Sequence, residues 1–338
     1  MLQRFIDLHL HSSASDGRYP PARLIEMAHA RGLSAVALTD HDTTAGLAEA
    51  ARRAAELNLE FIPGIELEAA HPRGTLHILG YFIDPNSPAL QSLAARAIES
   101  RTTRNEAILE KLAAEGLHLA MSDLTNDLPA NAEPLTTGFN EQNGSHPAPS
   151  ELSNLKSDIQ SSMSQSPDRH IAKSPDRQIA KSIGRPHIAH ALVRTHQVKD
   201  FRTAFTDYLA DGAKCFVPLN LPTAETVLSA ITTAHGLASL AHPVRLNCES
   251  SLELRTLAKR LREAGLRAIE TIHPSHTPAQ TVDYEKLAAE LKLSATGGSD
   301  FHRLPPKQGH GIGFGRVKVP YELLIPLRRL HPFTCVSF

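Results

Sequence analysis

Short apolar runs alternate along the chain with stretches of helical periodicity. The runs that predict β-strands are residues 5–10, 34–38, 60–67, 75–82, 237–241, 268–272 and 293–296. Apolar residues spaced three and four apart predict helices between several of them, at residues 20–31, 44–57, 251–264 and 278–291. Repeated strand and helix units are typical of a parallel sheet covered by helices, and about seven of them favour closure into a barrel. The pattern therefore predicts an α/β barrel.

The middle of the chain interrupts this alternation. Residues 90–115 predict a long helix. It belongs to a small helical insertion, expected at residues 90–125 and 183–222, so the barrel is expected in two parts, 1–89 and 223–338. Within residues 126–182, 27 of 57 positions are Ser, Pro, Asn, Gln or Gly, and Phe139 is the only aromatic residue. Such a segment buries too little apolar surface to offset the entropy lost on ordering. We therefore predict a disordered linker at 126–182.

Composition excludes several classes of protein. The 338 residues include 35 Lys and Arg and 36 Asp and Glu, so the formal net charge is −1 and no global positive field exists to hold long duplex nucleic acid. No apolar run approaches the roughly 18 to 20 residues of a membrane span. The first residues also lack a basic region followed by an apolar stretch. We expect a cytoplasmic protein without membrane contact, and the sequence leaves its oligomeric state open.

Histidine and carboxylate side chains gather where the predicted strands end. His9 and His11 are two apart and project from one face of an extended chain, Asp16 follows in a turn, and Asp40 and His41 come directly after the second strand. Further candidates are Glu66 on the third strand, His77 on the fourth, and Asp300 and His302 beyond the last. The carboxyl ends of barrel strands converge on one mouth, so we expect these groups to meet there and bind metal.

Eight motifs, spread over both ends of the chain, carry or adjoin these residues. They are Asp-Leu-His-Leu-His at 7–11, Ser-Asp-Gly at 15–17, Thr-Asp-His-Asp at 39–42, Pro-Gly-Ile-Glu at 63–66, His77, Gly-Arg-Pro-His at 184–187, Ala-His-Pro at 241–243 and Gly-Ser-Asp-Phe-His at 298–302. Together they resemble the PHP family, the polymerase and histidinol phosphatase superfamily of metal-dependent phosphoesterases. The resemblance implies a distorted (β/α)7 TIM-like barrel with a trinuclear metal site. It is closest to the stand-alone branch that contains nucleoside 3′,5′-bisphosphate phosphatases and a 5′-to-3′ exoribonuclease.

The resemblance also implies which residues hold each of the three divalent metal ions. The first ion would be held by His9, His11, Glu66 and Asp300. Glu66 would bridge to the second, held also by His77 and His187, and the third would be held by Asp16, His41 and His302. The chain departs from the branch in the longer low-complexity stretch before His187. Imidazole and carboxylate ligands without thiolate favour Mn²⁺, Fe²⁺ or Zn²⁺ over Ca²⁺, and Mn²⁺ is the metal we expect.

Cationic groups outside this set are candidates for binding the substrate phosphate. Arg101 and Arg104 lie three apart on one face of the predicted insertion helix, with Asn105 beside them. Arg185 precedes Pro186 at a predicted helix start, where free amide groups attract phosphate. Arg245 is a weaker candidate for the same role.

Three more residues are expected to act from outside the metal ligands. His242 in Ala-His-Pro is interpreted as a donor to the phosphate or to the leaving oxygen. Asp40 and Glu270 are interpreted as outer partners of the metal ligands. For Glu270, and for His273 and His276 just beyond it, a structural role is an equal alternative.

These residue types fit phosphoester hydrolysis without a protein nucleophile. Two metal ions about 3.5 to 4 Å apart can share a hydroxide and hold the phosphoryl oxygens. The sequence favours hydrolysis of phosphate monoesters of small nucleotides, namely nucleoside 3′,5′-bisphosphates or nucleoside monophosphates. The alternatives are a 5′-to-3′ exoribonuclease acting on short 5′-phosphorylated RNA, a histidinol phosphatase, and a non-catalytic metal-binding scaffold module. Because every ligand position expected of the family is occupied, the scaffold is the least favoured.

Overall fold

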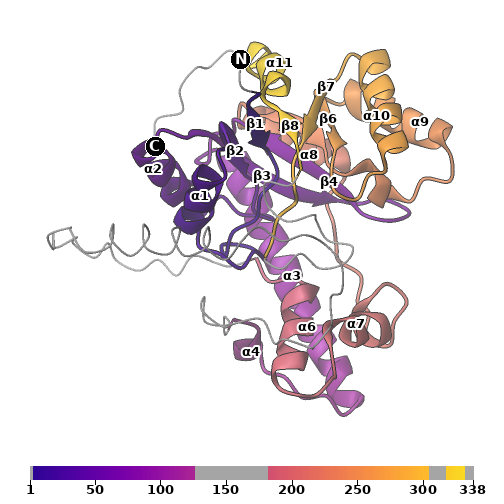
Figure 1. Ribbon diagram of the computed structural model, residues 1–338. Helices are drawn as coiled ribbons and strands as arrows, with labels where there is room; N and C mark the ends of the chain where they lie inside the picture. Colours follow the sequence, from indigo (N-terminus) through magenta and orange to yellow (C-terminus); the bar gives the residue numbers. More distant parts are fainter. Residues whose placement is uncertain (1–2, 126–181, 304–316, 332–338) are drawn as a thin grey trace, which may run out of the picture. The chain divides into compact units, whose positions relative to one another are not determined.

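One sheet organises the computed structural model, which describes residues 3–125, 182–303 and 317–331 (Figure 1). The predicted linker at 126–182 lies outside these residues except for its last position. The strands are β1 (Phe5–Asp7), β2 (Ala35–Leu38), β3 (Glu60–Ala69), β4 (Leu76–Tyr81), β5 (Leu237–Leu240), β6 (Ala268–Ile272), β7 (Ser294–Gly297) and β8 (Val319–Pro320). Their order in the sheet is β7-β6-β5-β4-β3-β2-β1-β8.

The sheet nearly closes between β7 and β1. The backbone N–H of Leu8 donates to Gly297 O at 3.2 Å, and that of His11 donates to Phe301 O at 3.1 Å. Leu10 and Phe301 form a parallel bridge in the same seam. The predicted distorted seven-stranded barrel is therefore confirmed, with β8 added as an antiparallel strand on β1.

Strand β4 departs from the parallel sheet that the sequence predicts. It is antiparallel to both β3 and β5. Parallel neighbours need a crossover of roughly a dozen residues or more, whereas only residues 70–75 join β3 to β4. His77, the second residue of β4, therefore stands where the strand begins rather than at its carboxyl end. His9 and His11, in contrast, lie just beyond β1, which ends at Asp7.

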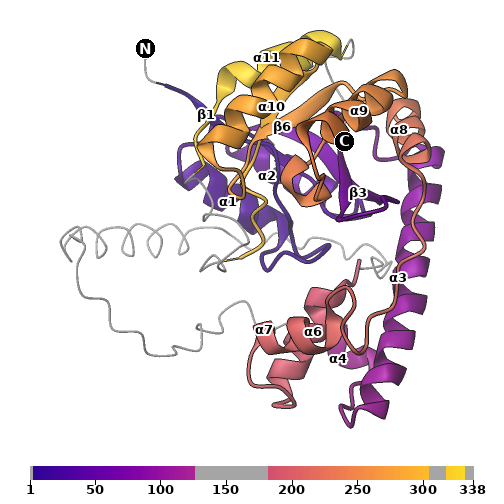
Figure 2. The same ribbon diagram turned by 90° about the vertical axis from the view of Figure 1, so that its right-hand side faces the viewer.

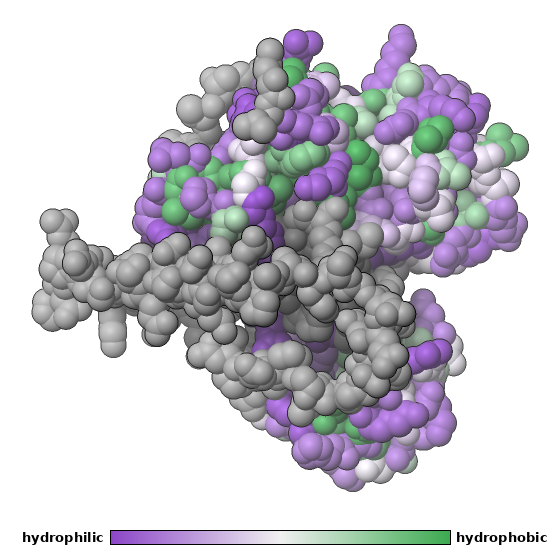
Figure 3. All heavy atoms as spheres, in the orientation of Figure 1, coloured by the Kyte–Doolittle hydropathy of each residue, from purple (hydrophilic) through white to green (hydrophobic). Residues whose placement is uncertain are grey.

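Helices cover the sheet and enclose the core (Figures 1 and 2). They are α1 (Pro21–Ala30), α2 (Leu47–Glu56), α8 (Ala224–Thr233), α9 (Ser251–Glu263), α10 (Pro278–Leu291) and α11 (Leu324–Leu330), with short 3₁₀ turns η2 (Pro243–Leu246) and η3 (Tyr321–Leu323). Buried Leu24 and Val227 from these helices pack with Ile78 and Leu240 of the strands. In Figure 3, the apolar atoms on the drawn face lie in small groups among hydrophilic ones. None of the described helices combines the length and apolar character that crossing a bilayer requires.

The helical insertion has a core of its own. It contains α3 (Pro88–Ala114), α4 (Met121–Thr125), α6 (Arg185–Arg194), α7 (Phe201–Thr203) and the π-helix η1 (Ala204–Leu209). Leu90 and Leu93 of α3 belong to the barrel core, whereas Ile108 and Leu112 of the same helix belong to the insertion core. Figure 2 shows α3 as one continuous helix. A single helix thus joins the two cores, and Arg101 and Arg104 lie between its two ends.

Candidate metal centre and phosphate site

The first group of candidate ligands surrounds one carboxylate oxygen of Glu66. Glu66 Oε2 lies 3.1 Å from Nε2 of both His9 and His11. Asp300 Oδ1 lies 3.5 Å from His9 Nε2 and 3.3 Å from His11 Nε2. All four side chains are buried, and their ligand atoms lie within 4.8 Å of one another. The structure thus brings together the four residues implied for the first metal.

The other oxygen of Glu66 faces a different pair of histidines. Glu66 Oε1 lies 2.8 Å from His77 Nδ1 and 3.1 Å from His242 Nε2. His187 is not beside them in the structure, where its Nδ1 accepts the Gly184 N–H at 3.0 Å. The structure therefore has His242, rather than His187, in contact with Glu66 beside His77.

Strand order explains why His242 lies next to His77. His242 follows β5, which pairs with β4, the strand that carries His77. His187 instead lies in the first turn of α6, in the insertion. The backbone of His242 has φ 25° and ψ 68°, in the left-handed half of conformational space that non-glycine residues rarely adopt. Such strain is maintained only where surrounding contacts determine it, and it is frequent at functional sites.

The third group lies around Asp16. His302 Nε2 is 3.1 Å from Asp16 Oδ1, and His41 Nε2 is 4.0 Å from Asp16 Oδ2. His11 approaches the same carboxylate with Nδ1 at 3.9 Å. A neutral imidazole offers one lone pair, so His11 can serve either this group or the Glu66 group. His41 also faces Glu66, with Nδ1 3.4 Å from Oε2.

This donor set fits divalent metal ions. Ligand atoms that share a metal at about 2.1 Å lie roughly 3.0 to 3.4 Å from one another. The distances from Glu66 Oε2 to His9 and His11 and from Asp16 to His302 are in this range, whereas His41 and His11 lie somewhat farther from Asp16. Both ring nitrogens of His11 and Nδ1 of His41 are buried without a hydrogen-bond partner in the described structure. Buried polar atoms in that state are costly unless something else satisfies them. The three groups contain imidazole and carboxylate and no thiolate.

Opposite charges set the protonation of the cluster. Burial alone would raise the pKa of Glu66, but His9, His41 and His77 outweigh it and hold that pKa well below its usual value. Burial would likewise lower the pKa of His11, yet contacts with Asp300 and Glu66 raise it to about 10. Metal-free protein therefore holds a proton on His11 at neutral pH. A metal ion must displace that proton, because only the neutral imidazole is a ligand.

Glu270 contacts His9 and His242 and orients both of them. Its Oε1 lies 3.1 Å from His9 Nδ1, and its Oε2 accepts the backbone N–H of His242 at 2.7 Å. Burial raises its pKa, but His9 and His273 draw it down to about 2, so the carboxylate is ionised. With Nδ1–H donated to Glu270, His9 presents the Nε2 lone pair toward Glu66. Such carboxylate–imidazole pairs commonly fix the tautomer of a metal ligand.

Asp40 holds the turn that carries Asp16. One of its oxygens accepts the Ser12 backbone N–H at 2.7 Å and the Ser15 hydroxyl at 2.6 Å, and the other accepts the Ser12 hydroxyl at 2.6 Å. Ser15 belongs to the Ser-Asp-Gly motif, whereas Ser12 lies outside the motifs identified from the sequence. Asp40 therefore acts on the cluster by fixing a loop.

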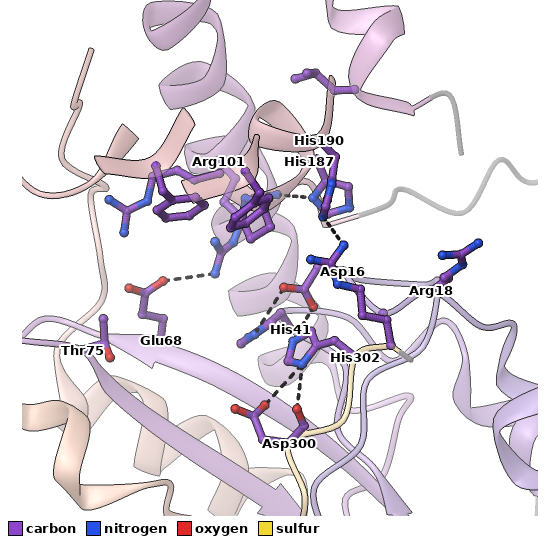
Figure 4. Close-up of a pocket in the computed structure, with 18 of the residues that line it drawn as sticks. Asp16, Arg18, His41, Glu68, Thr75, Arg101, His187, His190, Asp300 and His302 are labelled. Atoms are coloured by element: carbon purple, nitrogen blue, oxygen red, sulfur yellow. Dashed lines mark hydrogen bonds and ion pairs between the residues drawn. The ribbon is translucent and has the colours of Figure 1, made fainter. Parts of the chain in front are cut away.

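A cavity of about 450 Å³ opens beside the three ligand groups. Its lining includes candidate metal ligands, the predicted phosphate-binding arginines and His187. Figure 4 shows Arg101, His187 and His190 on one side of the cavity and His41, Asp300 and His302 on the other. An anion in this space would therefore lie between the metal groups and guanidinium groups.

Arg101 is fixed in this cavity by two carboxylates. Its Nε donates to Asp42 Oδ2 at 2.6 Å, and its Nη2 donates to Glu68 Oε2 at 3.2 Å. Burial would lower its pKa, but Asp42 and Glu68 raise it, so Arg101 stays charged. The sequence predicts no role for Asp42 or Glu68, because their contacts with Arg101 join elements far apart in the chain.

The other predicted phosphate contacts differ in how they are held. Burial, together with Arg101 and Arg185, lowers the pKa of Arg104 to about 9, and its Nε has no hydrogen-bond partner in the described structure. Asn105 accepts from Arg104 Nη2 at 3.2 Å and donates to Ile183 O at 2.9 Å. Arg185 donates to Leu209 O and to Asp211. Arg245 instead donates to Asp300 Oδ2 at 2.8 Å, so it neutralises a candidate ligand.

Several lining residues were missed from the sequence. Arg18, Glu68, His190 and Arg303 all line the cavity. Two of them adjoin motifs, since Arg18 follows Ser-Asp-Gly and Arg303 follows Gly-Ser-Asp-Phe-His. That adjacency is the signal that would have identified them.

Comparison with known proteins agrees with this geometry. The model of the PHP domain matches residues 7–132. A 3′,5′-nucleoside bisphosphate phosphatase from Chromobacterium violaceum is 31% identical, over 91% of this chain and 90% of that protein. A 5′-3′ exoribonuclease from Haemophilus influenzae is 28% identical, over 88% of this chain and 89% of that protein. A solved structure from Bifidobacterium adolescentis, assigned to the metal-dependent phosphoesterases, has a TM-score of 0.74 at 25% identity and 98% coverage of both chains.

Histidines and carboxylates gather at the mouth of a nearly closed barrel, beside an arginine-lined cavity. Together with these relatives, this arrangement defines a metal-dependent phosphoesterase. The chain belongs to the PHP family.

Proposed function

We propose that this enzyme hydrolyses phosphate monoesters of small nucleotides, with nucleoside 3′,5′-bisphosphates or nucleoside monophosphates as substrates. The observation that carries the proposal is the position of the cavity, between the three ligand groups and the arginines of the insertion. Its volume of about 450 Å³ suits a ligand of nucleotide size rather than a polymer.

We assign the binding of three divalent ions, with Mn²⁺ as the expected metal, to the converging side chains. The proposed ligands are His9, His11, Asp16, His41, Glu66, His77, His242, Asp300 and His302. Divalent ions held there would supply an activated water and Lewis acidity toward the phosphoryl oxygens. His187 lines the cavity and is assigned to substrate binding instead.

The chain's own residues position the substrate and balance its charge. Arg101, held by Asp42 and Glu68, presents a fixed guanidinium, whereas Arg104 is the less compensated charge beside it. A phosphate dianion that binds between them would relieve the repulsion between the two guanidinium groups. Glu270 accepts from His9 Nδ1 and so directs the His9 Nε2 lone pair toward the cluster.

Phosphate release tests the proposal. Purified protein with Mn²⁺ should release inorganic phosphate from adenosine 3′,5′-bisphosphate, and Asp300→Asn should abolish release because it removes a charged ligand. His29→Gln, at an exposed position on α1, is the matched control and should retain activity. Release that survives Asp300→Asn unchanged would refute the assignment.

The same assay separates the alternatives. A ladder of mononucleotides from 5′-phosphorylated RNA, without phosphate release from the bisphosphate, would identify an exoribonuclease. Preferred hydrolysis of histidinol phosphate would identify a histidinol phosphatase. Bound metal without turnover of any phosphoester would identify a scaffold module.

A further inference from the structure

Three phenylalanines line the same cavity, and two of them, both from the helical insertion, have no role in the hydrolysis described above. Phe201 comes from α7 and Phe205 from η1, and both rings are partly exposed where they line the cavity. Their centroids lie 4.9 Å apart with an interplanar angle of 25°, so the rings are stacked. Most other lining residues are polar or charged, apart from Leu124, Pro186 and Phe301, so this stacked pair is an aromatic surface in a largely polar lining.

The backbone that carries these rings is unusual. Helix α7 has three residues and continues into the π-helix η1. π-Helical turns are rare and are frequently found at functional sites. Neighbouring Ala204 and Leu209 are buried in the insertion core, so the segment is anchored while Phe205 remains partly exposed. The local fold thus fixes an aromatic surface against the cavity.

An arginine is held against this surface from the barrel. The Arg303 guanidinium carbon lies 5.6 Å from the Phe201 ring centroid, and its Nη1 donates to His190 Nε2 at 2.6 Å. His190 packs on Phe201 with ring centroids 4.8 Å apart. Burial, with Arg303 beside it, lowers the pKa of His190 to about 3, so the imidazole is neutral and accepts this bond. The guanidinium is therefore held by an imidazole and lies against an aromatic ring.

The aromatic surface adjoins the metal groups. Arg303 directly follows His302, which lies 3.1 Å from Asp16. A ligand with its phosphate at the metal groups therefore has an apolar, π-rich wall and a guanidinium close to its other end. Planar heteroaromatic rings are the groups that such a wall recognises, by stacking and by cation–π contact.

We propose that Phe201, Phe205 and Arg303 form a nucleobase subsite for the substrate. This inference rests on the proposed function, because it assumes that the phosphate of the same molecule lies at the metal groups. Every base offers a π-face, so stacking gives affinity with little discrimination between bases. The enzyme should therefore act on nucleotides of all four bases and disfavour phosphates that lack a base.

Kinetics on a matched pair of substrates tests the subsite. The pair is adenosine 3′,5′-bisphosphate and 1-O-methylribose 3,5-bisphosphate, which carries a methoxy group in place of the base. Phe205→Leu should raise KM for the adenosine compound about tenfold or more, with kcat largely kept. Phe205→Leu should leave kcat/KM for the methylriboside unchanged. Phe205→Trp, which keeps an aromatic ring, should have a KM for adenosine 3′,5′-bisphosphate close to that of the wild type.

Tyr208→Leu is the matched control. Tyr208 lies on the same π-helix but does not line the cavity, so its replacement should alter neither substrate. Melting temperatures of the three variants show whether any of them loses the insertion fold. Equal losses on both substrates, or no change in the adenosine KM, would overturn the proposal.

Failure of the proposed function would be recognised separately. If wild-type protein with Mn²⁺ releases phosphate from neither compound, calorimetric binding of the two compounds decides the subsite. Weaker binding of the adenosine compound alone by Phe205→Leu would support the subsite without hydrolysis. Equal binding by the wild type and the variant would overturn it.

Discussion

Arg104→Met should make the ligand-free protein more stable while it impairs hydrolysis. Arg104 is only 7% exposed, and its Nε has no hydrogen-bond partner in the described part of the chain. Burial, together with the charges of Arg101 and Arg185, lowers its pKa to about 9. The enzyme therefore keeps a positive charge at a position where folding alone disfavours it.

The size of the effect follows from that pKa. A fall from 12.5 to about 9 corresponds to roughly 5 kcal/mol against the charged form, at about 1.4 kcal/mol per pH unit. Methionine keeps most of the aliphatic stem but loses the bond to Asn105, which costs about 1 kcal/mol. Structural relaxation and water penetration reduce the rest of the penalty on the charged form, so we expect the free energy of unfolding to increase by about 1 to 2 kcal/mol. Loss of a charged contact to phosphate should lower kcat/KM by about 10- to 100-fold.

Two measurements check this prediction. Denaturant unfolding of metal-free, phosphate-free protein at pH 7 gives the stability, and phosphate release with Mn²⁺ gives the activity. Arg96→Met, at an exposed position on the same helix, is the control and should change neither. Added inorganic phosphate should stabilise the wild type more than Arg104→Met. A variant less stable than the wild type, or one with full activity, would refute the reasoning.

Three further predictions concern the metal groups and Arg101. Glu270→Gln should weaken Mn²⁺ binding about 10- to 100-fold, because the amide N–H of the new glutamine must face either the His9 N–H or a backbone N–H. Chelator competition measures the Mn²⁺ affinity, and an unchanged affinity would contradict the prediction. Mn²⁺ binding should release protons at pH 7 and strengthen as the pH rises toward about 10, since His11 holds its proton up to that pH in metal-free protein. Calorimetry in buffers of different ionisation enthalpy measures the number of protons released. Binding without proton release would contradict the prediction. Arg101→Met should destabilise metal-free protein by about 3 to 5 kcal/mol, because it leaves buried Asp42 without its cation. Denaturant unfolding measures the loss of stability. An Arg101→Met protein as stable as Arg104→Met would contradict the prediction.

The barrel and most of the cluster follow from local signals. Hydrophobic periodicity identifies the strands, and the seam between β7 and β1 brings the two ends of the chain together. His9, His11, Glu66 and Asp300 therefore meet although 291 positions separate His9 from Asp300. For these residues, the position of each group relative to its strand is enough to predict that they converge.

The exceptions depend on packing between distant elements. His242 rather than His187 faces Glu66, because β5 pairs with an antiparallel β4 while His187 is carried by the insertion helix. The contact between Asp42 and Arg101 joins the end of the β2 segment to α3, and no spacing along the chain encodes it. Phe201 and Phe205 line the cavity from α7 and from the π-helix that continues it, a conformation that helical periodicity does not predict.

Anomalous diffraction from Mn²⁺-loaded crystals tests the central claim most directly. We predict anomalous peaks on both sides of the Glu66 carboxylate and a further peak at Asp16, with His242 rather than His187 as the imidazole beside His77. Peaks outside these groups, or none in protein that hydrolyses phosphate monoesters, would contradict the assignment of the converging histidines and carboxylates to metal.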